Sequence, residues 1–287
     1  MQKFLALFCV LLAGATAARA QVNVEIILDD PQFLRGEPVT GRVKISNFSG
    51  QTLRLGEDPE WLTFLVTGTD GKALRALEPM PPVKPFTIGS AQSVALRVDL
   101  APYYDLQTAG RFAASARIKF AQLEKEFTTE SGKFDIISGV KVWEKEVGVP
   151  GRTPPVVRKF ALQQAAFFKE TRLYVRVSEA NEAEIIRVIA LGALPSSGRP
   201  EAAVDTSSQM HVLFQAGQKN FTYALVTPEG DLLLRQTHEI TATRPRLRAE
   251  PDGRIVVSGG IRKISPTDLP PPPPKLETNA VVQVQQP

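Results

Sequence analysis

At 287 residues the chain is long enough for two domains of ordinary size. Its apolar content of 43% is ample for ordinary hydrophobic cores. The 34 Lys and Arg against 30 Asp and Glu leave a formal charge of +4. Both signs are mixed along the chain, so the charge argues against a nucleic-acid-binding protein.

The first twenty residues carry the features of an export signal. Lys3 gives a short positive start, residues 4–13 form an apolar run, and Ala18-Arg19-Ala20 matches a small-x-small cleavage site before Gln21. A membrane-spanning helix needs about 20 apolar residues, and this run is shorter. We therefore expect residues 1–20 to be a cleaved signal peptide. The mature protein is predicted to be periplasmic or secreted, with no membrane span after cleavage.

Cleavage at this position removes Cys9, the one cysteine in the sequence. The mature chain would then have no disulfide, no thiolate nucleophile and no cysteine-ligated zinc. Burial of a core would have to stabilise it, and a cysteine-free exported protein suits a bacterial periplasm at least as well as an animal extracellular space.

Residues 21–138 have the strand pattern of a β-sandwich. In residues 40–46, Val43 and Ile45 alternate with polar residues, which is typical of a strand with one wet face. Asp70-Gly71 is the strongest short hairpin signal in this region. About seven to nine strands at regular spacing predict a sandwich. The other expected strands are residues 24–28, 52–55, 61–67, 93–100, 112–118 and 133–137.

The motifs of this half resemble immunoglobulin-like sandwiches of bacterial exported proteins. Gly36-Glu37-Pro38-Val39, then Ile45-Ser46-Asn47 and the Asp70-Gly71 hairpin, are similar to macroglobulin-type domains and to the bacterial intracellular proteinase inhibitor domain. Tyr104-x-Leu106 before Gly110-x-Phe112 resembles the corner that precedes the penultimate strand in such folds. The resemblance implies that the Tyr104 hydroxyl bonds to the backbone. A proteinase-inhibitor activity would need a reactive loop, and none can be matched residue by residue.

Residues 139–155 are predicted to be a linker, because six Gly and Pro residues interrupt them. A strand at Val140–Trp143 is one alternative within this junction. Residues 156–264 then form a second β-rich domain, with strands expected at 157–162, 172–177 and 184–189. Residues 160–168 could instead form two helical turns, since Ala, Leu and Gln favour helix.

The second domain contains a repeat at a shift of 45 residues. Arg199-Pro200 leads into the apolar run Met210–Leu213, and Arg244-Pro245 leads into Ile255–Ser258 at the same spacing. Between them, Phe221–Val226 and a Pro-Gly turn form a predicted hairpin. A period of roughly 40–50 residues resembles the four-stranded blades of β-propellers. Propellers close with at least four blades, so we expect an open or partly stacked structure, or edges that pair elsewhere.

The C-terminal residues 265–287 contain five consecutive prolines, Pro270–Pro274. Such a run favours a stiff polyproline segment without backbone donors. We expect this tail to be disordered, with a docking role for the proline run as the alternative.

The two histidines offer one candidate for catalysis. Asp205 and Ser207 or Ser208 precede His211, so a Ser–His–Asp hydrolase can be imagined. No Gly-x-Ser-x-Gly motif is present, and the residues around His211 are typical of an ordinary strand. The prediction is no catalytic residue, although carboxylates dispersed in sequence could still meet in space, as in glycoside hydrolases.

No metal or cofactor is predicted. Neither His211 nor His238 has a second histidine at ligand spacing. Asp29-Asp30 and residues 57–60 are acidic, but they lack the alternating oxygen ligands of calcium loops.

One row of cations is the candidate ligand surface. Arg244, Arg246 and Arg248 are two residues apart, so in a strand all three lie on one face. The row could bind a phosphate, sulfate or carboxylate; the alternative is the wet face of an edge strand, where cations prevent aggregation.

These patterns together predict an all-β, non-enzymatic exported protein. We expect it to bind a protein, glycan or envelope component through its loops, with no nucleic-acid partner. A proteinase-inhibitor-like module is the alternative function, and a hydrolase with dispersed carboxylates is a third.

Overall fold

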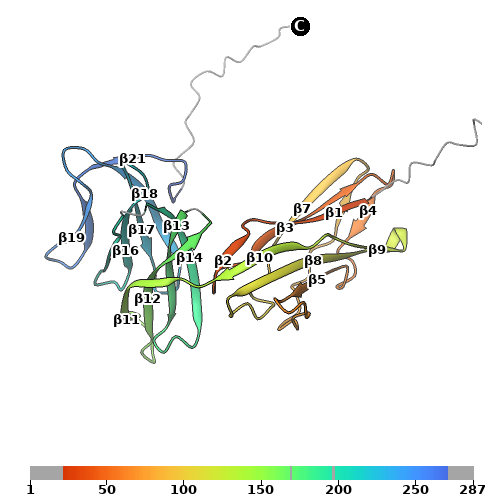
Figure 1. Ribbon diagram of the computed structural model, residues 1–287, viewed down its shortest axis with the longest axis horizontal. Coiled ribbons are helices and arrows are strands. Elements are labelled where there is room, and N and C mark those ends of the chain that lie inside the picture. The colour runs from red at the N-terminus through yellow and green to blue at the C-terminus, as the bar shows by residue number, and fades with distance from the viewer. Residues whose placement is uncertain (1–21, 169, 196–197, 271–287) are drawn as a thin grey trace, which may run out of the picture. The chain divides into compact units, whose positions relative to one another are not determined.

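The computed structural model describes residues 22–168, 170–195 and 198–270. In these residues the regular elements are β-strands, apart from one short 3-10 turn at Ala121–Leu123, which confirms the predicted all-β fold (Figure 1). None of their helical segments has the length and apolar character to cross a membrane. The predicted signal peptide, residues 1–20, lies outside the described residues.

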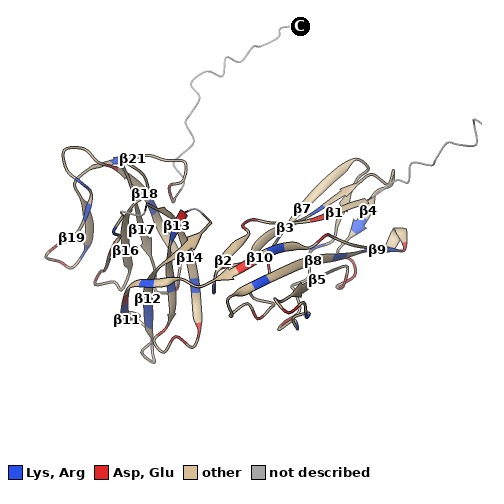
Figure 2. Cartoon of the chain, in the orientation of Figure 1, with Lys and Arg blue, Asp and Glu red and all other residues tan. Residues whose placement is uncertain are grey.

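The chain divides into two compact units. Among the described residues, the first contains 22–33 and Pro38–Ile136, and the second contains Leu34–Glu37 and the residues from Ile137 to 270. Figure 2 shows cations and anions interspersed on strands of both units, as the mixed charge of the sequence suggested.

The first unit contains two main sheets that share apolar cores. Val43 and Ile45 of one sheet and Ala116 and Ile118 of the other belong to one buried cluster, so the predicted alternation at Val43 and Ile45 is confirmed. One sheet has the order β1 (Val22–Leu28), β3 (Thr40–Asn47), β7 (Gln92–Asp99). The other has the order β2 (Gln32–Leu34), β10 (Gly132–Ile137), β8 (Gly110–Phe120), β5 (Leu62–Thr67), with β9 (Lys125–Thr128) also on β8. A short pair is formed by β4 (Leu53–Leu55) and β6 (Phe86–Ile88).

Tyr104 ties the loop after β7 to strand β5. Its hydroxyl donates a hydrogen bond of 2.8 Å to the Phe64 carbonyl, and its ring is buried. This is the backbone bond that the sequence resemblance implied.

Replacing Tyr104 with Phe is expected to lower the free energy of unfolding by about 0.5–1.5 kcal/mol, because one hydrogen bond is lost while the ring stays packed. Urea denaturation of the mature protein measures this change. Tyr103→Phe, at the neighbouring position, is the matched control. An equal loss in both variants would contradict the role assigned to the Tyr104 hydroxyl.

The second unit also has two larger antiparallel sheets, and they enclose one core. Phe160, Leu162 and Val175 of one sheet pack with Val212 and Phe214 of the other. The first sheet has the order β11 (Val140–Gly148), β12 (Val157–Phe167), β13 (Glu170–Glu179), β14 (Ile185–Leu194). The second has the order β15 (Glu201–Val204), β16 (Met210–Gln215), β17 (Asn220–Val226), β18 (Leu232–Glu239), β21 (Ile261–Lys263).

Two expectations for this half need correction. Much of the predicted linker, residues 139–155, is strand β11, which pairs with β12 along its length. The helical alternative for residues 160–168 is wrong, because Phe160 and Leu162 alternate into the core along β12. In both places the pairing of neighbouring strands outweighs local sequence signals.

The prediction of a disordered tail from residue 265 is wrong for residues 265–270. Asp268 is 4% exposed and forms a salt bridge of 2.7 Å with Arg262. The backbone groups of Leu269 and Arg235 exchange two hydrogen bonds. Residues 265–270 therefore belong to the fold, and residues 271–287 lie outside the described residues.

The 45-residue shift relates two hairpins. Strand β15 maps onto β19 (Arg246–Ala249) and the start of β16 maps onto β20 (Ile255–Ser258), and each pair is antiparallel. The second hairpin is a two-stranded sheet of its own. Its Leu247 and Val257 pack on Leu213 and Tyr223, so the hairpin covers the face of β16 and β17 opposite the shared core.

Candidate functional site

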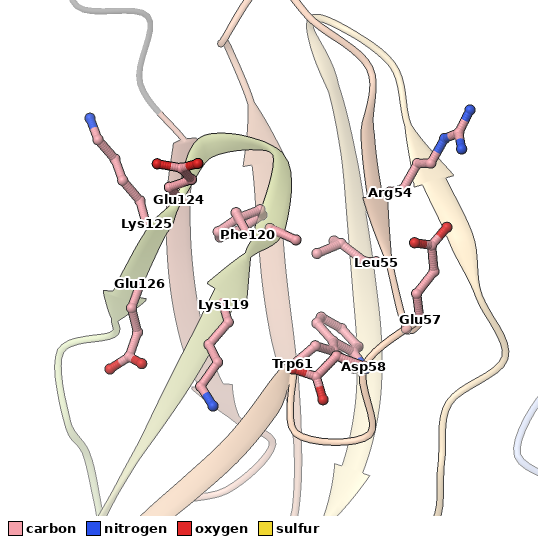
Figure 3. A pocket seen from close by; sticks show the side chains of 12 residues that line it. Arg54, Leu55, Glu57, Asp58, Trp61, Lys119, Phe120, Glu124, Lys125 and Glu126 are labelled. Atoms are coloured by element: carbon pink, nitrogen blue, oxygen red, sulfur yellow. The ribbon is translucent and has the colours of Figure 1, made fainter.

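A cavity of about 600 Å³ opens in the first unit beside Trp61 (Figure 3). We call it the Trp61 cavity. Leu55, Trp61 and Phe120 form its apolar wall, and Figure 3 shows these three side chains together with charged side chains around them. The charged lining residues are Arg54, Glu57, Asp58, Lys119, Glu124, Lys125 and Glu126.

The loop Gly56–Trp61 is held in a fixed shape. Gly56 has φ of +85°, and a Cβ there would lie 3.0 Å from the Cα of Pro85, so glycine is required. The Asp58 carbonyl accepts the Trp61 amide at 3.1 Å, and its carboxylate accepts the Glu60 amide at 2.9 Å. The Trp61 ring meets Phe86 edge to face at 5.7 Å. The cavity wall is therefore preformed before any ligand arrives.

Two further cavities adjoin Trp61. One of about 270 Å³ lies between strands β5 and β7, with Leu62, Phe64, Leu96 and Val98 among its lining residues. Another of about 290 Å³ is lined by residues 56–59 and 82–85 together with Trp61. Trp61 therefore lines all three cavities, which together form a hollowed surface around it.

The charges around the Trp61 cavity are of both signs. Three cations and four anions line it, so it has no strong single-sign field. Lys119 pairs with Glu60 at 3.4 Å, outside the apolar wall. An apolar wall with a mixed-charge rim suits a ligand held by burial of apolar area and by hydrogen bonds, such as a peptide or a sugar.

In the second unit, Asp205, His211 and Tyr223 form a hydrogen-bonded chain. His211 Nε2 lies 3.1 Å from the Asp205 carboxylate, and Nδ1 lies 2.9 Å from the Tyr223 hydroxyl. One tautomer satisfies both contacts: Nε2–H donates to Asp205, and Nδ1 accepts from Tyr223. Burial and the nearby Asp205 charge raise the pKa of Tyr223 to about 12.

This chain differs from the hydrolase arrangement considered from sequence. The structure brings Asp205 to His211, but the Ser208 hydroxyl donates to the Gly148 carbonyl at 2.7 Å. The hydroxyl beside His211 belongs to Tyr223, which sequence reasoning missed, since it lies on the neighbouring strand. His211 is 5% exposed and Tyr223 is 7% exposed, so a substrate has no access to either ring as the chain is folded. The arrangement satisfies buried polar groups.

The second histidine also approaches Tyr223. The His238 ring meets Tyr223 edge to face at 6.3 Å, and its Nε2 is buried with no hydrogen-bond partner among the described residues. Burial lowers the pKa of His238, the Arg262 charge lowers it further, and Asp268 acts in the opposite direction. Within the residues that the structure describes, no three His, Cys, Asp or Glu side chains converge as metal ligands.

The second unit is expected to lose stability on mild acidification through His238. Because its folded-state pKa lies below the ordinary 6.5, the contribution of the neutral ring is complete above pH 6.5. It is lost as the pH falls through 6.5 toward the folded-state pKa. Urea denaturation between pH 8 and pH 5 should therefore show a shallower pH dependence for His238→Phe than for the unmodified protein. Identical profiles would contradict this role.

The acidic pairs weighed as calcium loops have other partners. Asp29 lies 3.6 Å from Arg42 and 3.7 Å from Arg97. The Asp58 carboxylate accepts a hydrogen bond from the Glu60 amide within its own loop.

The three arginines of the candidate ligand surface are exposed, and two of them have partners. The Arg244 guanidinium lies over the Phe221 ring at 4.9 Å, and Arg246 pairs with Glu201 at 2.7 Å. Arg248 is exposed on β19. Arg246 lies with Arg248 on β19, but Arg244 precedes that strand, so the expectation that one strand carries all three is wrong. The use of these arginines as a ligand surface stays a prediction.

No protein-family model and no curated protein matches the chain. Among solved structures, it is similar to the sporulation control protein Spo0M from Bacillus subtilis, with 11% sequence identity, covering 57% of this chain and 82% of that chain. The TM-score is 0.25, so this likeness carries no argument about fold type or function.

Proposed function

We propose that the protein is a non-enzymatic binding protein of the bacterial periplasm or cell envelope. The observation that carries the proposal is the hollowed surface around Trp61, where a rigid loop holds preformed cavities with apolar walls. Preformed concave surfaces of this kind are where proteins bind ligands. The signal peptide predicted from the sequence of residues 1–20 supports the location.

The finer fold assignments belong to this proposal. The Tyr104–Phe64 bond and the paired antiparallel sheets support an immunoglobulin-like type for the first unit. The related hairpins β15–β16 and β19–β20 support a blade-like origin for the second. Both types present recognition surfaces at loops or sheet edges, which agrees with a binding role.

The test is capture from native envelope extracts. Mature protein, residues 21–287, is immobilised beside a double variant, Lys119→Glu with Lys125→Glu, which makes the rim of the Trp61 cavity acidic. We expect a component retained by the unmodified protein and lost by the variant. The matched control is the double variant Arg246→Ala with Arg248→Ala on the second unit, which should retain the component as well as the unmodified protein does. Capture that depends on those arginines instead would contradict the assignment to Trp61.

A protease panel addresses the alternative function. We expect no inhibition at micromolar protein, because the binding surface is a cavity and not an extended reactive loop. Stoichiometric inhibition of any protease would replace the present proposal with the inhibitor-like module.

A further inference from the structure

We propose that strand β7 binds an extended peptide segment along its free edge, with alternate apolar side chains of the peptide in the 270 Å³ cavity. This inference rests on the proposed binding function and names the class of ligand. It starts from the position of β7, which pairs with β3 on one side and has no strand on its other side among the described residues.

The cavity follows the backbone of β7. Four consecutive residues, Leu96 to Asp99, line it. Successive side chains of a strand point to opposite faces, so a run of neighbours in one lining means that the strand edge itself faces the cavity. Such an edge offers main-chain N–H and C=O groups to another extended chain.

The apolar side chains at this edge are incompletely covered. Leu96 and Val98 of β7, and Leu62 and Phe64 of β5, lie on the core side of their sheets but are only partly buried. Both strands are the last of their sheets. The cavity between them is about 270 Å³, against about 30 Å³ for one water in the liquid, so it has room for side chains.

The facing strand β5 is closed to the same kind of pairing. The Phe64 carbonyl already accepts a hydrogen bond from the Tyr104 hydroxyl, and the Val66 carbonyl accepts one from the Leu74 amide at 2.7 Å. Ala73 forms a bridge with Thr67. The edge of β5 beside the cavity is therefore already hydrogen-bonded within the fold, whereas the edge of β7 is open among the described residues. We therefore assign peptide binding to β7.

Charge on the wet face of β7 fixes the preferred ligand. Arg97 and Asp99 lie two residues apart on β7, and the residue between them, Val98, belongs to the buried side. An antiparallel segment would place one outward residue opposite Asp99 and the next outward residue opposite Arg97. Opposite charges stabilise such cross-strand pairs, so the complementary order is cation, apolar residue, anion. The four lining residues span roughly 13 Å, which a pentapeptide covers.

The probe is an acetylated and amidated pentapeptide of the order lysine, valine, glutamate, valine, threonine. Calorimetric titration into mature protein measures its affinity, and hydrogen exchange measures protection of the backbone amides of residues 92–99. We expect binding together with slower exchange at alternate amides of β7. The Leu100 amide donates to the Val39 carbonyl of the β3 side, so by alternation the backbone groups of Arg97 and Asp99 face the free edge. A peptide N-methylated at its lysine and glutamate, which lie opposite Asp99 and Arg97, should therefore bind at least about tenfold more weakly, because it loses main-chain hydrogen bonds.

Protein variants locate the site. Met80 lines the cavity from a loop, so Met80→Glu should weaken the probe at least about tenfold with little effect on folding, by placing a charge against apolar side chains. Arg248→Ala, on the second unit, should leave the affinity unchanged. Circular dichroism confirms that each variant is folded.

Three results would overturn the inference. The first is no binding of the probe at millimolar concentration, and the second is slower hydrogen exchange at β1 and not at β7. The third is a dimer whose β7 amides exchange slowly without peptide, which would assign the edge to a second copy of the chain. Binding of the probe without capture of any envelope component would instead remove the proposed function and leave the edge site standing.

Discussion

Asp205→Ala is expected to lower the free energy of unfolding of the second unit by about 1–3 kcal/mol, because buried hydrogen-bonding groups lose their acceptor. The substitution removes the acceptor for His211 Nε2 and for the backbone amides of Ser207 and Gln209. His211 would then be buried with one ring nitrogen unpaired, and Tyr223 would lose the orientation of its partner. Urea denaturation followed by far-UV circular dichroism measures the loss.

The matched control is Asp252→Ala in the β19–β20 turn. Asp252 is an exposed residue whose side chain bonds to Arg254. We expect no measurable change there. If Asp205→Ala were as stable as the unmodified protein, the hydrogen-bonded chain would not be structural, and a chemical role for His211 would have to be reconsidered.

Trp61→Ala is expected to cost the first unit about 3–5 kcal/mol. Trp61 is 4% exposed, packs against Phe86 and belongs to the core shared by the two sheets. Its removal would open a void and release the loop of residues 56–61, which contributes lining residues to all three cavities. Chemical denaturation gives the stability, and exchange of the amides of residues 56–61 reports the loop.

Trp61→Phe keeps an aromatic ring and should cost less than Trp61→Ala. Trp143→Phe, in the second unit, is the control for the general effect of losing a tryptophan. A loss below about 1 kcal/mol for Trp61→Ala would mean that the loop is held by its backbone bonds alone.

The alternation of side chains in the sequence predicted the strands well, because burial on one face of a sheet imposes a period of two. Val43 and Ile45 were recognisable in this way, whereas residues 160–168 left a helix open as the alternative. Gly139, Gly148 and Pro150 were misleading, since they suggested a linker where β11 pairs with β12. Pairing depends on a neighbouring strand that local sequence does not name.

The candidate site was largely hidden from sequence for the same reason. The Trp61 cavity joins residues 54–61 with residues 119–126, which are far apart in the chain. Residues 57–60 were noted only as an acidic loop. Tyr223 reaches His211 from the adjacent strand, so no spacing along the chain could have indicated the pair. The spacing of the arginines was visible in sequence, but only Arg246 and Arg248 lie on one strand, β19.

The most direct test of the account is photo-crosslinking in the native envelope. A photoreactive amino acid is placed at Lys125, on the rim of the Trp61 cavity, and separately at Arg248 on β19. We predict a discrete crosslinked partner from position 125 and none from position 248. A partner trapped only from position 248, or none from either position, would contradict the claim that the surface around Trp61 is where this protein binds.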